Sequence, residues 1–285
     1  MRSDMVTDPI AHHGEGVIWD TSAGKLRWVD MLAGDVLSMA PREHEPDRLD
    51  VGAVATAIRP RRAGGLAIAL ERGFALLDAD MEVRRLLGEI WRDPTVRMND
   101  GACDPQGRFY CGSMAYDAAP GRGSLYRLEP DYSVHTVLDD VTISNGLAWS
   151  ADGDTAYYID SPTQRVDAFD FDAANGTLRN RRPVVSIDPD DGTPDGMAVD
   201  AEGFLWVAMW GGGAVRRYAP DGRLDGIVEV GARQVTACAF GGPNLDELYI
   251  TTSRQGLAEG EDPGAGALFR CRPGVHGLTL HHFAG

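Results

Sequence analysis

Four short polar segments recur along the chain and carry the residues best suited to chemistry. Each places a carboxylate or a carboxamide beside a small residue, and a short apolar run follows. The four segments are Gly14-Glu15-Gly16, Asn99-Asp100-Gly101, Ser144-Asn145-Gly146 and Pro194-Asp195-Gly196. If they belong to equivalent units of a ring, their side chains converge on one site of hard oxygen ligands. Such a set suits Ca²⁺, Mg²⁺ or Mn²⁺ better than a structural zinc, while Zn²⁺ or Fe²⁺ fits an open catalytic position.

A simpler interpretation is that each segment is only a turn, since Asn-Gly and Asp-Gly are strong turn formers. Recurrence at one register argues against this, because a turn requires neither Glu15 nor Asn99. Several buried carboxylates around one axis would repel one another and lose their hydration, and a divalent cation offsets both effects. The sequence therefore predicts a divalent cation at this point, such as Ca²⁺, Mg²⁺ or Mn²⁺. A cation that only pins the units together is the structural alternative.

The elements that must position these side chains are strands. Runs of aromatic and β-branched residues recur, most of them after a Gly-containing turn, and further strand-like runs follow. These runs are Leu26–Asp30, Leu66–Leu70, Phe109–Gly112, Ala156–Asp160, Leu205–Met209 and Leu248–Thr251. Four strands per unit and six units predict an all-β fold, a six-bladed β-propeller with four-stranded antiparallel blades.

The repeat also predicts where the blades begin. No stretch of ten residues has a helical period and no Pro/Gly/Ser-rich linker divides the chain, so we expect residues 1–285 to form a single β-propeller domain. The last outer strand would come from Met5–Ile10 or from Leu278–Phe283. The expected starts, 39 to 50 residues apart, are near Glu15, Val54, Asp100, Asn145, Asp195 and Val235.

Composition limits the classes of partner. A net charge of −16 disfavours nucleic acid, and no apolar run is long enough to span a membrane. The first residues lack the apolar segment of a signal peptide, so we expect a cytoplasmic protein, a monomer or a small homo-oligomer. The four cysteines show no CxxC spacing and are expected to be reduced core residues.

The polar segments also carry a family resemblance that runs in order over residues 12–270. The chain resembles the gluconolactonase/regucalcin (senescence marker protein) family. The resemblance implies a six-bladed propeller that binds one divalent metal in its channel and hydrolyses sugar lactones. The segments concerned are Gly14–Trp19, Arg97–Gly101, Ile143–Ser150, Asp160-Ser161, Val166–Asp170, Arg181-Arg182, Pro194–Met197 and Phe240–Gly242.

The resemblance also implies roles for individual residues. Glu15, Asn145 and Asp195 match the family's metal ligands, and Arg97 and Asn99 match its substrate-contacting pair. Asp117 falls where the family has an acidic residue that touches substrate hydroxyls, a Glu in the animal members. The repeat alignment places Asp100 in register with the ligands, whereas the resemblance favours Asn99. Because side chains alternate along a strand, we expect Asn99 to face the site and Asp100 to support it from the wall.

These residues predict a mechanism for opening a cyclic ester. The metal would polarise the carbonyl and activate water, and Asp195 is the candidate general base, although coordination would depress its pKa and weaken it. Arg97 would recognise an oxyanion or hydroxyl, while Asn99 and Asp117 would read ring hydroxyls. Two alternatives stay open. One is a phosphotriesterase-like or other ester hydrolase on the same metal site, and the other is a non-catalytic calcium-binding propeller.

Other polar or aromatic residues receive weaker predictions. His12 and His13 are expected to be exposed N-terminal histidines, and His281 and His282 are expected to be exposed near the C-terminus. Trp210, which precedes three glycines, could either form the base of a sugar-binding site or pack over the end of the hydrophobic core. No serine lies in a Gly-x-Ser-x-Gly elbow, so serine-esterase chemistry has no support.

Overall fold

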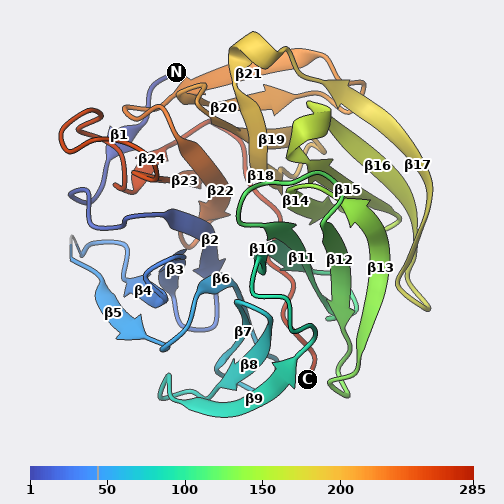
Figure 1. The fold of residues 1–285 in the computed structure, drawn as a ribbon. Coiled ribbons are helices and arrows are strands. Elements are labelled where there is room, and N and C mark those ends of the chain that lie inside the picture. The colour runs from blue at the N-terminus through green and yellow to red at the C-terminus, as the bar shows by residue number, and fades with distance from the viewer. Residues whose placement is uncertain (44) are drawn as a thin grey trace.

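Six four-stranded sheets surround a central channel in the computed structural model, which describes residues 1–43 and 45–285 (Figure 1). All strand pairs within these sheets are antiparallel, as in the contact between β2 and β3. The predicted six-bladed β-propeller is confirmed. Outside the strands, the described residues form only two short 3-10 helices, η1 (Ser161–Thr163) and η2 (Pro189–Asp191). No helix in this part of the chain is long and apolar enough to cross a membrane.

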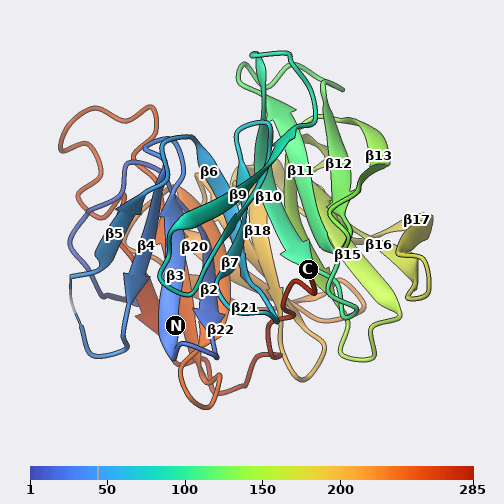
Figure 2. The ribbon, with the colours of Figure 1, turned by 90° about the horizontal axis from the view of Figure 1, so that it is seen from below.

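Each blade runs from an inner strand at the channel to an outer strand at the rim (Figure 1), and Figure 2 shows the ring of blades from the side. The inner strands are β2 (Gly14–Asp20), β6 (Ala55–Pro60), β10 (Val96–Cys103), β14 (Ser144–Trp149), β18 (Thr193–Val199) and β22 (Val235–Gly241). The second strands are β3 (Lys25–Asp30), β7 (Leu66–Leu70), β11 (Phe109–Ala115), β15 (Thr155–Asp160), β19 (Leu205–Trp210) and β23 (Glu247–Thr252). The third strands are β4 (Asp35–Met39), β8 (Gly73–Leu77), β12 (Gly123–Leu128), β16 (Arg165–Asp172), β20 (Ala214–Tyr218) and β24 (Phe269–Cys271). The outer strands are β5 (Asp47–Asp50), β9 (Val83–Glu89), β13 (Val134–Val141), β17 (Thr177–Ser186), β21 (Leu224–Glu229) and β1 (Asp4–Met5).

The ring closes through the N-terminus. Strand β1 pairs with β24, with Asp4 opposite Arg270 and Met5 opposite Phe269, so the first strand of the chain completes the last blade. Of the two predicted closures, the N-terminal one is therefore confirmed, although its strand covers only Asp4–Met5. The C-terminal alternative, Leu278–Phe283, is wrong as an outer strand.

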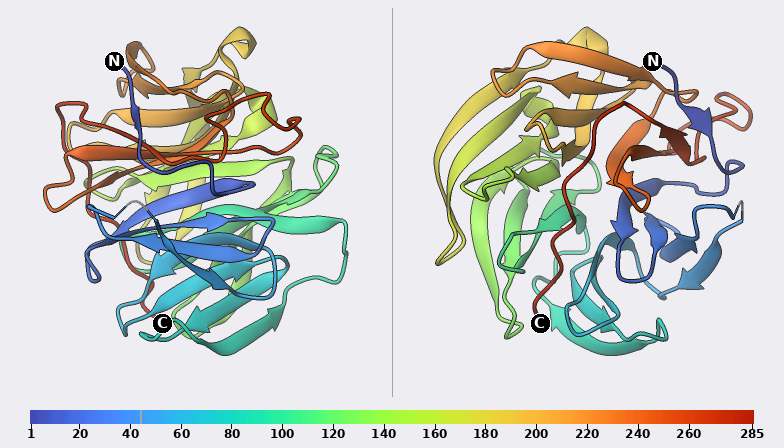
Figure 3. Two further views of the ribbon diagram at one scale, coloured as in Figure 1. Left: turned by 90° about the vertical axis from the view of Figure 1, so that its left-hand side faces the viewer. Right: turned by 180° about the vertical axis from the view of Figure 1, so that it is seen from behind.

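Instead, residues 276–285 cross one end of the channel, and we call them the C-terminal strap (Figure 3, right). Backbone hydrogen bonds tie the strap to three blades: Gly277 N to Leu245 O at 2.8 Å, Phe283 N to Pro60 O at 2.9 Å, and Ala284 N to Gly107 O at 2.9 Å. The Phe283 ring is fully buried between blades. The strap lies across this end of the channel, and we call the opposite end the mouth.

Hydrophobic side chains of neighbouring blades form the core. The second strands are almost wholly buried, as the predicted aromatic and aliphatic runs require; every residue of β11 is buried, for example. All four cysteines are buried and free, which confirms the prediction of reduced core residues.

Every inner strand carries a β-bulge at the same place. The register shifts between Glu15 and Ile18 in β2, and corresponding shifts occur in the other five strands. A bulge opposes two residues to one and locally suspends the alternation of side chains. The extra residues are Gly16, Thr56, Asp100, Gly146, Gly196 and Thr236, and the residues before them are Glu15, Ala55, Asn99, Asn145, Asp195 and Val235.

This bulge corrects the repeat alignment. Two of the six predicted anchors are wrong by one residue, because Ala55 replaces Val54 and Asn99 replaces Asp100. Asn99 lines the cavity and Asp100 does not, as expected, although the two residues lie in the bulge of β10 rather than in regularly alternating strand. Spacing alone does not reveal a bulge, since a run such as Asn-Asp-Gly offers two polar residues for one position.

The small bulge residues let neighbouring inner strands approach closely. A Cβ added to Gly146 would lie 2.7 Å from the carbonyl oxygen of Asp195, on the next blade. A Cβ on Gly196 would likewise lie 2.8 Å from the carbonyl oxygen of Thr236. The glycines of the polar segments therefore serve the packing of the ring and bring the polar residues before them together.

Candidate active site

A cavity of about 180 Å³ at the mouth gathers five of the sequence-predicted residues. Four of them stand at or just before the bulges of their inner strands, Arg97 lies two residues further upstream, and all are more than 90% buried. The five residues are Glu15, Arg97, Asn99, Asn145 and Asp195.

Both carboxylates are buried, and the nearby Arg97 charge offsets only part of the cost of ionising them there. Burial, and then the nearby Asp100 carboxylate, raise the pKa of Glu15 to about 8. Burial, and then repulsion from Glu15, also raise the pKa of Asp195. Both carboxyls therefore favour the protonated state unless a cation compensates for their charge. A site that concentrates negative charge in this way is suited to a divalent cation.

The Asn145 side chain is oriented by hydrogen bonds at both of its ends. Its Nδ2 donates to Ser161 Oγ at 2.8 Å, and that hydroxyl donates to the carbonyl oxygen of Pro194 at 2.6 Å. Its Oδ1 accepts from Asn99 Nδ2 at 2.6 Å. This arrangement turns the carboxamide oxygen into the cavity, where a second lone pair is left for a ligand.

Arg97 is a buried cation with a donor to spare. Its Nη1 donates to Asn99 Oδ1 at 2.6 Å and to the carbonyl oxygen of Met98 at 2.9 Å, while its buried Nε has no partner. Burial lowers the pKa of Arg97, but a guanidinium remains charged because it starts so far above neutrality. The Tyr116 ring lies 5.6 Å from the guanidinium carbon. Arg97 can therefore recognise an oxygen atom of a ligand.

The structure separates Asp100 and Asp117 from the cavity lining. Asp100 accepts a hydrogen bond from Gly101 N at 2.6 Å, and its charge raises the pKa of both Glu15 and Asp195, so it lies close to them. Asp117 is exposed in the turn after β11, and its carboxylate accepts from Ala119 N at 3.1 Å. It follows Tyr116, which does line the cavity.

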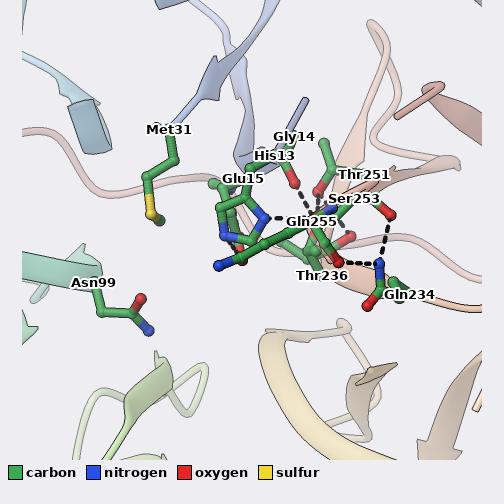
Figure 4. Close-up of polar contacts among 12 residues, drawn as sticks. His13, Gly14, Glu15, Met31, Asn99, Gln234, Thr236, Thr251, Ser253 and Gln255 are labelled. Carbon is green, nitrogen blue, oxygen red and sulfur yellow. Dashed lines mark hydrogen bonds and ion pairs between the residues drawn. The ribbon is translucent and has the colours of Figure 1, made fainter. Parts of the chain in front are cut away.

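His13 corrects the expectation of an exposed N-terminal histidine, because it is 4% exposed and lines the cavity (Figure 4). Its Nδ1 lies 2.7 Å from Ser253 Oγ, and its Nε2 lies 4.0 Å from Glu15 Oε1. Burial, and then the Arg97 charge, lower the pKa of His13 to about 3, so the imidazole is neutral. His12 is exposed as expected, whereas His281 and His282 are half-buried on the strap rather than exposed.

For three further residues that line the cavity, the sequence had predicted either no role in the site or two alternative roles. Trp210 is half-buried and meets the His13 ring edge-on at 5.9 Å, so it belongs to the site wall. Gln255 and Tyr116 come from loops after second strands, where no local pattern marks a residue as facing the channel. The Gln234 carboxamide donates to the carbonyl oxygens of Ser253 and Gln255, each at 3.0 Å, and holds that loop against His13 (Figure 4).

The donor set of the cavity fits a hard cation only if the carboxamide takes part. Within residues 1–43 and 45–285, no three His, Cys, Asp or Glu side chains gather closely enough to hold a metal ion. Glu15 and Asp195 contribute two carboxylates, and the oriented Oδ1 of Asn145 supplies a third oxygen. Carboxylate and amide oxygens are the usual ligands of calcium, magnesium and manganese.

Comparisons with known proteins show which family this chain belongs to. Residues 13–254 match the family described as SMP-30/Gluconolactonase/LRE-like region. Regucalcin of Danio rerio is 37% identical over 279 residues, which cover 95% of each chain. The solved structure of a calcium-binding protein, regucalcin, from Agrobacterium tumefaciens superimposes with a TM-score of 0.93 at 28% identity, covering 100% of this chain and 98% of that one.

A solved gluconolactonase from Xanthomonas campestris superimposes with a TM-score of 0.75 at 25% identity, covering 93% of this chain and 87% of that one. The family match spans most of the chain and includes every residue of the mouth cavity except Gln255. The chain belongs to the SMP-30/gluconolactonase/LRE-like family.

Proposed function

We propose that this protein is a divalent-metal-dependent hydrolase that opens a sugar lactone to the aldonic acid. The observation that carries the proposal is the convergence of Glu15, Asn145 and Asp195 with Arg97 and Asn99 in one buried cavity. Membership of a family that includes gluconolactonases supports a sugar lactone as the substrate.

In this proposal Glu15, Asn145 and Asp195 hold the metal, with calcium as the first candidate. The bound cation would supply Lewis acidity towards the lactone carbonyl. The raised pKa values of the two carboxyls fit this role, because the metal replaces the protons that burial otherwise favours. Asp100, close to both carboxylates, would strengthen cation binding through its charge.

The remaining residues would orient the lactone and handle the proton. Arg97, which lines the cavity, would donate from its guanidinium to an oxygen of the substrate near the reacting carbonyl. Asn99 reads a ring hydroxyl, and Trp210 offers an apolar face at the wall. Asp195 accepts the proton of the attacking water as general base. Asp117, exposed at the end of β11, would reach hydroxyls that project from the mouth.

The test is turnover of a panel of aldonolactones by chelated protein, with each divalent metal restored in turn. We expect no turnover above the spontaneous rate after chelation and recovery with at least one metal. The matched variants are Asp195→Asn and Asp200→Asn, because Asp200 is also a buried carboxylate but lies beside the strap, outside the cavity.

The name of the Agrobacterium relative favours one competing function, a non-catalytic calcium-binding propeller. That function predicts calcium binding that Asp195→Asn weakens, together with no lactone turnover under any metal. Failure to turn over any aldonolactone with metal demonstrably bound would therefore reject the hydrolase and retain the metal site.

A further inference from the structure

The imidazole of His13 lines the mouth cavity but has no role in the reaction proposed above. Its place on the wall is fixed by the backbone and by packing. The backbone N–H of His13 donates to Asp30 Oδ1 at 2.9 Å, and its carbonyl oxygen accepts from Met31 N at 2.9 Å. The Trp210 ring meets the imidazole edge-on, with 5.9 Å between the ring centroids. The imidazole is therefore held in place before any ligand enters the cavity.

Ser253 orients one of the two ring nitrogens. Its Oγ lies 2.7 Å from His13 Nδ1, and the two residues also pair in an antiparallel bridge (Figure 4). Ser253 is fully buried, and Gln234 holds its backbone on both sides. Ser253 N donates to the carbonyl oxygen of Gln234, and Gln234 Nε2 donates to the carbonyl oxygen of Ser253, each at 3.0 Å. The neighbouring blade therefore fixes the hydroxyl that faces Nδ1.

The hydrogen bonds of Ser253 also decide which ring nitrogen of His13 carries a hydrogen. Ser253 Oγ accepts from Gln255 N at 3.0 Å, and among the described residues the only acceptor within reach of its own hydrogen is His13 Nδ1. A neutral imidazole that accepts at Nδ1 carries its hydrogen on Nε2. A charged imidazole carries a hydrogen there as well. Nε2 is therefore a donor in either state, because the remaining tautomer would leave a buried hydroxyl unpaired.

Nε2 of His13 faces an acceptor that it does not reach. It lies 4.0 Å from Glu15 Oε1, which is beyond hydrogen-bond distance, and it has no hydrogen-bond partner in the part of the chain that the structure describes. Both residues line the cavity, so an oxygen atom bound there can lie about 2.9 Å from each. Because Nε2–H donates and a carboxylate accepts, the bridging group must both accept and donate. A hydroxyl meets this requirement, whereas a carbonyl does not.

We propose that His13 is a substrate-binding residue that donates from Nε2–H to a hydroxyl of the lactone, and that Ser253 is its positioning residue. This inference rests on the proposed function, in which Glu15 helps to hold the metal at the reacting carbonyl. The hydroxyl that also reaches Glu15 is then the one nearest that carbonyl, on C2 of the sugar. It accepts from His13 and donates to Glu15 Oε1, which has a second lone pair for the metal.

The first test compares two ligands on the calcium-loaded protein. An aldonolactam keeps the carbonyl and hydroxyls of the lactone but resists hydrolysis, and its 2-deoxy counterpart lacks only the hydroxyl in question. Isothermal titration of the wild type should show about 10-fold tighter binding of the aldonolactam than of the 2-deoxy compound. This preference should disappear in His13→Leu, which removes the donor and leaves room for the ligand. His13→Gln should keep part of it, because its amide nitrogen can take the place of Nε2.

His12→Leu is the matched control, since His12 is exposed and lies outside the cavity lining. It should keep the full preference of the wild type. A preference that persists in His13→Leu, or a wild type that does not distinguish the two ligands, would overturn the inference. A wild type that prefers the aldonolactam through His13 but turns over no lactone would reject the proposed hydrolase and keep this contact.

The second test reads the hydrogen on the ring directly. Nitrogen-15 NMR of the full chain with labelled histidine, assigned with His13→Leu, should show a hydrogen on Nε2 of His13. Ser253→Ala removes only the hydroxyl, so it should mix the two tautomers and reduce the preference for the aldonolactam several-fold. A wild-type ring with its hydrogen on Nδ1 alone would overturn the inference. An unchanged tautomer and an unchanged ligand preference in Ser253→Ala would overturn the role of Ser253.

Discussion

Asn99 donates a hydrogen bond from Nδ2 to Oδ1 of Asn145 at 2.6 Å, and so joins the inner strands of two blades at the mouth of the channel. Asn99 Nδ2 also donates to the carbonyl oxygen of Ser144 at 2.8 Å. The amide of Asn99 is therefore fixed by its neighbour blade, and the oxygen that it contacts is the proposed metal ligand. In the proposed function, Asn99 contacts the substrate and Asn145 binds the metal.

This relationship predicts different effects for the two carboxamides. Asn145→Ala removes a ligand and should abolish tight divalent-metal binding. Asn99→Ala removes only a contact to that ligand, and we expect metal affinity to fall about 10-fold, the lower range for such supporting contacts. Isothermal titration of the chelated protein with calcium or manganese measures both. Equal losses in the two variants would place Asn99 among the ligands.

A second prediction concerns the pH dependence of the metal-free protein. The pKa of Glu15 is raised from 4.5 to about 8 in the folded state, so the folded protein retains a proton that the unfolded chain has released between these values. The free energy of unfolding should therefore fall as pH rises through this range, by about 1.4 kcal/mol per pH unit for one proton. Asp195, whose pKa is also raised, acts in the same direction.

Urea denaturation with chelator present, at several pH values across this range, measures the slope. Glu15→Gln carries no proton to lose at this position and should show a flatter dependence. Saturating divalent metal should remove the decline in the wild type, because it binds the deprotonated carboxylates. A metal-free protein that becomes more stable from pH 5 to pH 8 would contradict the assignment.

Much of the fold and part of the site were predictable from local patterns. The aromatic and β-branched runs identify the second strands, and recurrence at blade-length intervals identifies the ring. Glu15, Asn145 and Asp195 stand out because each precedes a glycine at one register. His13, Tyr116 and Gln255 carry no such pattern, because they reach the cavity only when blades distant in sequence close the ring.

The repeat alignment placed its third anchor at Asp100 instead of Asn99 for a specific physical reason. A bulge is an irregularity of strand pairing, and its position depends on the partner strand rather than on the residues that form it. The strap escaped prediction for a similar reason. Residues 276–285 contain apolar residues that suit an outer strand, but the N-terminus already occupies that edge.

The bulge glycines yield a third prediction. In Gly146→Ala the new methyl group would lie 2.7 Å from both the Asp195 carbonyl oxygen and Ile159 Cδ1. One of these two atoms belongs to the backbone of the neighbouring inner strand, so that strand must move to make room. We expect the free energy of unfolding to fall by about 1–3 kcal/mol. Metal affinity should fall as well, since Asp195 shifts. Gly226→Ala is the control, because its Cβ meets only Arg217 Cβ at 3.8 Å. Chemical denaturation and calcium titration compare the two variants.

The last prediction ranks the two charged residues proposed to contact the lactone. Arg97 is buried in the cavity lining and held by Asn99, whereas Asp117 is exposed and engaged with its own turn. Arg97→Lys keeps the charge but loses the planar set of donors, and kcat/KM should fall about 10- to 100-fold, the worth of a charged hydrogen bond. Asp117→Ala should cost less and act mainly on KM, since a solvent-exposed contact replaces water that remains available. Steady-state kinetics on the best aldonolactone, with metal affinity measured alongside, separate the two effects. A larger loss for Asp117→Ala would mean that the loop after β11 folds over the bound lactone and brings this carboxylate into the cavity.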